Sequence, residues 1–105
     1  MKINFFVEAQ VEKEAIRLVQ DGLYSMEEII VSKEEQKVAP YWKMENVYIV
    51  EMTVELSQNT LQFFLESFSD DWLEIGNPVE ELLASKTNQG CKYMKEGFVL
   101  INIFL

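Results

Sequence analysis

The sequence offers few of the side chains that enzymes use for catalysis. Histidine, the commonest general base and metal ligand, is absent, so neither a Ser-His-Asp nor a Cys-His arrangement can form. The single cysteine, Cys91, has only Lys92 and Lys95 as nearby cations to stabilise a thiolate. The four glycines are too widely spaced for a dinucleotide fingerprint or a phosphate-binding loop. We therefore expect no enzymatic activity and no cofactor.

Carboxylates are the remaining groups that could do chemistry. The pair Asp70-Asp71 could bind Mg²⁺ or Ca²⁺, or act as general acid and base. Sequence neighbours usually point in different directions, however, and no alternating Asp-x-Asp-x-Asp-Gly loop surrounds the pair. We interpret Asp70-Asp71 as a polar turn after a helix, and Glu80-Glu81 as first-turn acids that interact favourably with a helix dipole. No metal site is predicted.

Negative charge is concentrated in the middle of the chain. Eighteen acids and nine bases give a net charge of −9, and no Lys or Arg occurs between Met44 and Ser85. A negative field of this size repels nucleic acid phosphates and anionic lipids, so direct nucleic-acid binding is disfavoured. Two interpretations stay open: an acidic surface that keeps the protein in solution, or a docking face for a basic partner.

Length and composition predict one domain over residues 1–105. The chain has 105 residues, of which 49 % are hydrophobic, enough to bury a core. The longest apolar stretch, Phe98 to Leu105, is interrupted by Asn102 and is far shorter than the roughly 20 residues that cross a bilayer. The N-terminus lacks the continuous apolar core of a secretory signal, and one cysteine cannot form an internal disulfide. We therefore expect a cytoplasmic protein without a membrane segment.

Hydrophobic periodicity predicts the elements of the first half. Alternation over Lys2–Ala9 indicates a strand, and apolar residues at helical spacing over Val11–Leu23 indicate a helix that stops at Gly22. For the following stretch a strand at Ile29–Val31 is favoured over a helix opened by Ser25. The polar run Lys33–Glu45, with Pro40, predicts a loop or the lip of a hairpin.

The second half contains the clearest strand and two predicted helices. Val47–Leu56 has one apolar face, from Tyr48 to Leu56, and one partly polar face that carries Glu51, Thr53 and Glu55. Asn59-Thr60 precedes a helix that carries Leu61, Phe64, Leu65 and Phe68 on one stripe. Trp72–Ile75 suggests a short strand. Asn77-Pro78-Val79-Glu80 has the pattern of a helix start and predicts a third, short helix that turns Val79, Leu82 and Leu83 inward. Thr87–Gly97 is expected to be a connection before the last strand, Phe98–Leu105.

This order of elements predicts an α+β fold. Strand, helix, two strands, helix and a final strand make the split βαβ plan, so we expect a ferredoxin-like sandwich with an antiparallel sheet and helices on one face. The short helix near Pro78 is an addition to that plan. The last strand, apolar on both faces, is expected at a sheet edge, where Phe98 to Leu105 would form a homodimer or partner interface.

Two tryptophans are candidate anchors for a partner. Trp42 lies beside Tyr41, Pro40 and Lys43 in a polar stretch and is expected to be exposed. Trp72, between Asp71 and Leu73, is expected to be a core residue at the end of an element.

The whole chain resembles the small acidic immunity proteins that bacteria encode with polymorphic and contact-dependent growth-inhibition toxins. The resemblance rests on size, the missing catalytic residues, the acidic middle, and Asp70-Asp71-Trp72-Leu73-Glu74-Ile75 followed by Glu80-Glu81-Leu82-Leu83. It implies a protein that binds a toxin domain, often a basic nuclease, and blocks its active site. The acidic surface would then be formed by Asp70, Asp71, Glu74, Glu51 and Glu55, with Tyr41 and Trp42 as apolar anchors.

Two other functions stay open. Ferredoxin-like sheets also occur in small ligand-binding and regulatory domains, which would bind a metabolite in a pocket between the helices and the sheet. A carboxylate- and metal-dependent enzyme is the third candidate.

Overall fold

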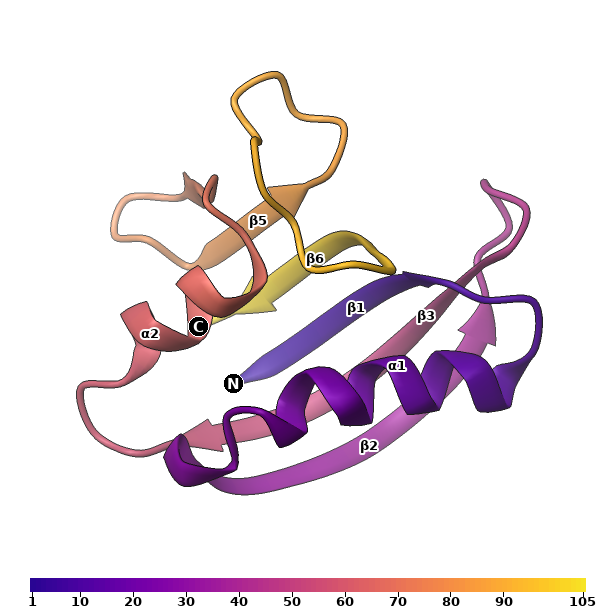
Figure 1. The fold of residues 1–105 in the computed structure, drawn as a ribbon. Helices are drawn as coiled ribbons and strands as arrows, with labels where there is room; N and C mark the ends of the chain where they lie inside the picture. Colours follow the sequence, from indigo (N-terminus) through magenta and orange to yellow (C-terminus); the bar gives the residue numbers. More distant parts are fainter.

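A six-stranded sheet with two helices on one of its faces forms the whole molecule (Figure 1). The computed structural model describes residues 1–105. The strands are β1 (Lys2–Glu8), β2 (Ile30–Pro40), β3 (Val47–Leu56), β4 (Leu73–Ile75), β5 (Glu81–Ser85) and β6 (Phe98–Phe104). The helices are α1 (Glu12–Tyr24) and α2 (Leu61–Phe68), and a short 3₁₀ turn, η1 (Glu27–Ile29), precedes β2.

The strands lie in the order β2-β3-β1-β6-β5-β4, and every neighbouring pair is antiparallel. The first and last strands of the chain are therefore central neighbours, with Lys2 opposite Phe104, and the two chain ends lie side by side (Figure 1). The edges of the sheet are β2 and β4. At the other end of β1 lie the β2–β3 hairpin, the connection into α1 and the long segment between β5 and β6.

Alternation in β1 separates the two faces of the sheet. Ile3, Phe5 and Val7 are fully buried against the helices, whereas Asn4 and Phe6 point to the opposite face and are half-buried. Helix α1 contributes Ala15, Val19 and Leu23 to this core, and helix α2 contributes Phe64, Leu65 and Phe68.

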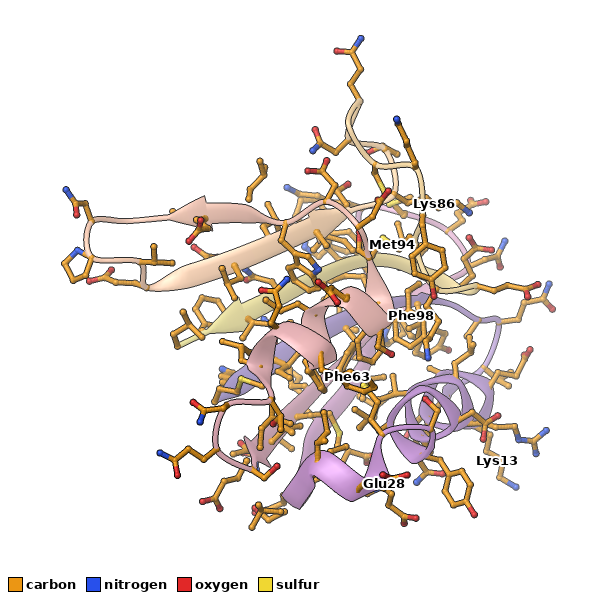
Figure 2. All side chains as sticks on the ribbon, turned by 60° about the vertical axis from the view of Figure 1, so that its left-hand side comes forward. Lys13, Glu28, Phe63, Lys86, Met94 and Phe98 are labelled. Carbon is orange, nitrogen blue, oxygen red and sulfur yellow. The ribbon has the colours of Figure 1, made fainter.

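An aromatic cluster lies where α2 meets the sheet. The Phe68 ring centroid is 5.2 Å from that of Phe64, 5.5 Å from that of Phe5 and 5.2 Å from that of Phe98. Figure 2 shows Phe98 between the helices and the sheet. Such tilted and edge-to-face pairs stabilise a core beyond the area that they bury.

Most elements predicted from the sequence are confirmed. The strand β3 has the predicted bounds, and β1, α1, α2, β4 and β6 fall within a residue or two of theirs. The α+β class is confirmed. The ferredoxin-like assignment is not, because the sheet has six strands and its order differs from the four-stranded plan.

The predicted third helix at Asn77-Pro78 is wrong, because these residues form the turn of a hairpin. The Glu80 N–H donates a hydrogen bond to the Ile75 carbonyl, and β4 pairs with β5 on either side of the turn. Leu82 and Ala84 are buried while their neighbours are not, which is the period of a strand. The apolar residues Leu82 and Leu83 were too few to distinguish this period from that of a helix.

The predicted loop over Lys33–Glu45 is wrong for its first part, because β2 continues to Pro40. Its residues pair along β3, but as an edge strand β2 is exposed over most of its length. Charged side chains and two register irregularities, near Val31 and Gln36, are typical of edge strands that avoid pairing with other chains. The polar composition therefore reflects exposure rather than a loop.

The last strand was expected at an edge, and this expectation is also wrong. Both sides of β6 are paired, with β1 and with β5. Its apolar character comes from this central position.

Neither helix has the length and apolar character of a membrane-spanning helix.

A backbone constraint at Gly97 gives a test of the fold. Gly97 has φ +88°, and a Cβ there would lie 2.6 Å from Leu18 Cδ2 of helix α1. We predict that Gly97→Ala lowers the free energy of unfolding by about 1–3 kcal/mol, measured by urea denaturation. The control, Gly90→Ala, meets only the end of the Asp71 side chain and should cost less. Equal losses of unfolding free energy in the two variants would contradict a backbone constraint specific to Gly97.

Candidate protein-binding surface

The sheet face that carries no helix is a candidate binding surface; we call it the open face. The strand registers place its side chains in rows across the sheet. An apolar row runs through Ala39, Ile49, Phe6 and Leu100 on β2, β3, β1 and β6. These four side chains are half-buried by their neighbours on the same face, although no helix covers them.

A polar row runs beside the apolar row. It consists of Lys37, Glu51, Asn4 and Asn102, which are opposite one another in register. The Glu51 carboxylate forms an ion pair with Lys2 Nζ, at a distance of 3.4 Å. Asn102 Nδ2 donates to Glu81 Oε1, whereas Asn4 Oδ1 is buried without a hydrogen-bond partner. The open face thus combines an apolar row with fixed carboxylates.

Residues 41–46 connect β2 to β3 and form what we call the aromatic hairpin. The Tyr41 N–H donates to the Val47 carbonyl at 2.8 Å, and the Ala9 N–H donates to the Asn46 carbonyl at 2.9 Å. The Tyr41 ring packs edge-on against Phe6, with 4.9 Å between ring centroids, which extends the apolar row to the hairpin. The expected exposure of Trp42 is confirmed, since 83 % of the residue is accessible.

A cleft of about 740 Å³ lies between the aromatic hairpin, the end of β1, the start of α1 and the residues after β5; we call it the end cleft. Glu8, Glu14 and Glu45 line it. Lys86, labelled in Figure 2, is the only cation in the lining and is ion-paired to Glu8 at 3.1 Å. Glu8 and Glu14 were missed as site residues because four separate segments build this cleft, and no local motif marks it.

The two aspartates predicted as docking residues make hydrogen bonds to their own chain. Asp70 Oδ1 accepts from the N–H groups of Lys92 and Tyr93 at 3.1 and 3.0 Å. Asp71 Oδ2 accepts from Asn88 Nδ2. These bonds attach the segment between β5 and β6 to the end of α2, so the polar turn expected here has a structural role.

The predicted site residues fall into two groups. Glu51, Glu55, Tyr41 and Trp42 lie on the open face or its hairpin. Glu74, opposite Leu82 in register, lies on the helix side of the sheet, and Asp70 and Glu74 line a groove there together with Trp72. The structure therefore does not assemble the seven residues into one patch.

The space between helix α1 and the sheet holds neither a metal site nor a pocket large enough for most small-molecule ligands. No group of three or more Asp, Glu or Cys side chains is placed to hold a metal ion. The pocket between α1 and the sheet, lined by Ile16, Val19 and Met52 among others, has a volume of about 140 Å³. Small-molecule sites are commonly about 300–1,000 Å³.

Comparisons with known protein families, with curated proteins and with solved structures find no match for this chain.

The hydrogen bonds at Asp70 predict a pH dependence of stability. The N–H of Tyr93, and more weakly that of Lys92, lowers the pKa of Asp70 below its ordinary value of 3.8, against the opposing effect of desolvation. A carboxyl group with a lowered pKa stabilises the folded state above its unfolded pKa, and this contribution is lost as the pH falls through the folded pKa.

We predict that Asp70→Asn lowers the melting temperature at pH 6 and that the difference from the unmodified protein shrinks from about pH 4 downward. Asp21→Asn, on helix α1, controls for the loss of one negative charge elsewhere. A difference at Asp70 that is constant from pH 6 to pH 2 would contradict the role of the ionised carboxylate.

Proposed function

We propose that the protein is an immunity protein that neutralises a cognate toxin domain by binding over its active site. The observation that supports this function best is the open face: an apolar row, continuous through Tyr41 with the exposed Trp42, beside carboxylates of the same sheet. Both helices lie on the opposite face. The mechanism needs no chemistry of its own, in keeping with the lack of catalytic side chains.

In this proposal the exposed side chain of Trp42 and the carboxylates around it have separate roles. Trp42 is presented on a hairpin whose backbone is fixed by hydrogen bonds to Ala9 and to Val47 of β3, so little conformational freedom is lost when a partner buries it. Buried tryptophans are frequent hot spots of protein interfaces. Carboxylates around such an anchor accelerate association with a basic partner and contribute less to the final affinity.

The partner is proposed to be a basic domain, such as a nuclease whose groove binds nucleic acid phosphates. Glu51 and Glu55 on β3 and Glu8, Glu14 and Glu45 at the end cleft would take positions that phosphates occupy in the substrate complex. Such a contact requires both proteins in one compartment, so we propose a cytoplasmic location.

We also propose that the fold contains a ferredoxin-like unit. Without β4 and β5, the remaining order is β2-β3-β1-β6, in which β3 lies between β1 and β2, the two strands joined through α1. That split βαβ arrangement, with both helices on one face, supports a ferredoxin-like unit to which the hairpin β4–β5 has been added at one edge.

A homodimer through Phe98 to Leu105 would now use the face of β6 rather than its edge. Leu100, Asn102 and Phe104 of this strand lie on the open face. Self-association there would cover the same surface as the toxin, so the two complexes would be mutually exclusive.

The alternative function, a ligand-binding or regulatory domain, would use the end cleft, whose volume of about 740 Å³ falls within the range of small-molecule sites. A metabolite that raises the melting temperature would favour it.

The test of the proposed function starts from the gene directly upstream in the source genome. The C-terminal domain that it encodes is expressed with and without this protein, and cell growth is measured. We expect the domain alone to stop growth and the pair to grow normally. A harmless neighbour, or a toxic one that this protein does not neutralise, would contradict the proposal.

The role of Trp42 is tested by Trp42→Ala. Loss of a buried aromatic anchor is expected to weaken binding of that domain by about tenfold or more, mainly through faster dissociation, measured by surface plasmon resonance. Tyr24→Ala is the matched control, because Tyr24 is also an exposed aromatic, 69 % accessible, but lies at the end of α1 on the helix side. Equal losses in the two variants would exclude the hairpin as an anchor.

The role of the open-face carboxylates is tested by the double change Glu51→Gln and Glu55→Gln. We expect association to slow by roughly two- to fivefold at low salt and its dependence on salt to become flatter. The same change at Glu27 and Glu28, in the turn η1, removes equal charge away from this face. If both double variants slow association equally, steering is a property of net charge rather than of the open face.

A further inference from the structure

A second concave surface lies on the helix side of the sheet, between α2 and the hairpin β4–β5; we call it the side groove. It has a volume of about 420 Å³. Figure 2 shows the hairpin extending beyond α2. The buried side chains of Leu65 and Leu82 belong to its floor, and Trp72 lies beside them. The remaining apolar lining comes from Leu61, Val79 and Leu105.

Trp72 is held in one orientation in the side groove. Its Nε1–H donates to the Leu65 carbonyl at 2.9 Å and to the Ser69 carbonyl at 3.2 Å, at the end of α2. The indole therefore has no free N–H to offer a ligand. What it can offer is its ring, which attracts cations.

The charged groups of the side groove are all negative. Asp70 and Glu74 line it, and no Lys or Arg does. The N–H groups of Lys92 and Tyr93 hold Asp70 through Oδ1, so that Oδ2 and the Glu74 carboxylate are left for an external cation. The same hydrogen bonds lower the pKa of Asp70, and the Lys92 ammonium, which is outside the lining, adds a smaller electrostatic effect in the same direction.

We propose that the side groove binds an arginine side chain presented by a segment of a partner protein. The methylenes lie on Leu65 and Leu82, and the guanidinium meets the Trp72 ring and the carboxylates of Asp70 and Glu74. An apolar floor with anions at its margin fits a side chain with an aliphatic stem and a charged end.

Arginine fits this arrangement better than lysine. A planar guanidinium stacks on an aromatic ring and forms paired hydrogen bonds with carboxylates, whereas an ammonium group is a compact, strongly hydrated charge. The volume of the groove and its apolar lining also leave room for a neighbouring apolar residue, which a peptide segment supplies.

The proposal does not rest on the proposed function, because the side groove and the open face lie on opposite sides of the sheet. A partner could therefore occupy the side groove whether or not another protein covers the open face.

The probe is the capped tripeptide acetyl-Leu-Arg-Leu-amide, titrated into the full chain and followed by two-dimensional NMR. We expect saturable shifts, in the millimolar range, of the Trp72 indole N–H and the Leu82 methyls, with little shift of the Trp42 indole. The matched peptide with citrulline, which keeps the shape but not the charge, should cause no saturable shift, and the lysine peptide should bind at least about threefold more weakly. Shifts that are absent, equal for citrulline or centred on the end cleft would overturn the proposal.

The role of the Glu74 carboxylate in binding the arginine peptide is tested by Glu74→Gln, with Glu80→Gln as the control. Glu80 is an exposed acid in the same hairpin and does not line the groove. We expect Glu74→Gln to weaken the arginine peptide by about fivefold or more and Glu80→Gln to change it less than twofold. Equal effects would overturn the proposal. Trp42→Ala should leave this titration unchanged whatever it does to toxin binding.

Discussion

The contact of Phe68 with Phe5, Phe64 and Phe98 is the interaction on which the arrangement of both surfaces depends. It fixes α2 over the two central strands, β1 and β6, beside α1. The end of α2 then positions Ser69, Asp70 and Asp71, whose hydrogen bonds hold the segment between β5 and β6. It also positions Trp72, from which β4 returns along the sheet edge. Because both helices complete the same core, the other face of the sheet is left open.

The two candidate surfaces follow from this division. On the open face, the strands supply a row of apolar side chains, and the hairpin after β2 adds an exposed tryptophan. On the helix side, α2 and the added hairpin β4–β5 leave a groove that is apolar inside and acidic at its margin. The segment without Lys or Arg, Met44 to Ser85, contributes to both, since it contains β3, α2, β4 and β5. Its negative charge is therefore divided between opposite sides of the molecule rather than concentrated on one face.

Sequence periodicity predicted the elements whose burial alternates regularly and missed those governed by distant contacts. The strand β3 was predicted with its bounds because Val50, Met52 and Val54 alternate with Glu51, Thr53 and Glu55. Only the start of strand β2 was predicted, and its continuation to Pro40 was missed because, as an edge strand, it buries little and its composition is that of a loop. The residues around Pro78 have the sequence pattern of a helix start. They form a hairpin turn instead because β5 pairs with β6, a contact between segments that are distant in the sequence. Trp42 was predicted as exposed from its polar neighbours, whereas the end cleft, built by Glu8, Glu14 and Glu45 from separate segments, has no local pattern to predict it.

The central claim is that the open face and the aromatic hairpin bind a basic protein domain. Hydrogen–deuterium exchange of this protein, free and in complex with the domain encoded upstream, tests it most directly, because exchange reports the covered backbone without any substitution. We predict slower exchange in residues 41–46 and in the neighbouring ends of β1 and β3, with the second half of helix α1, residues 18–24, unchanged. A complex in which protection is confined to α1 or to the segment between β5 and β6, with the hairpin unprotected, would contradict the account.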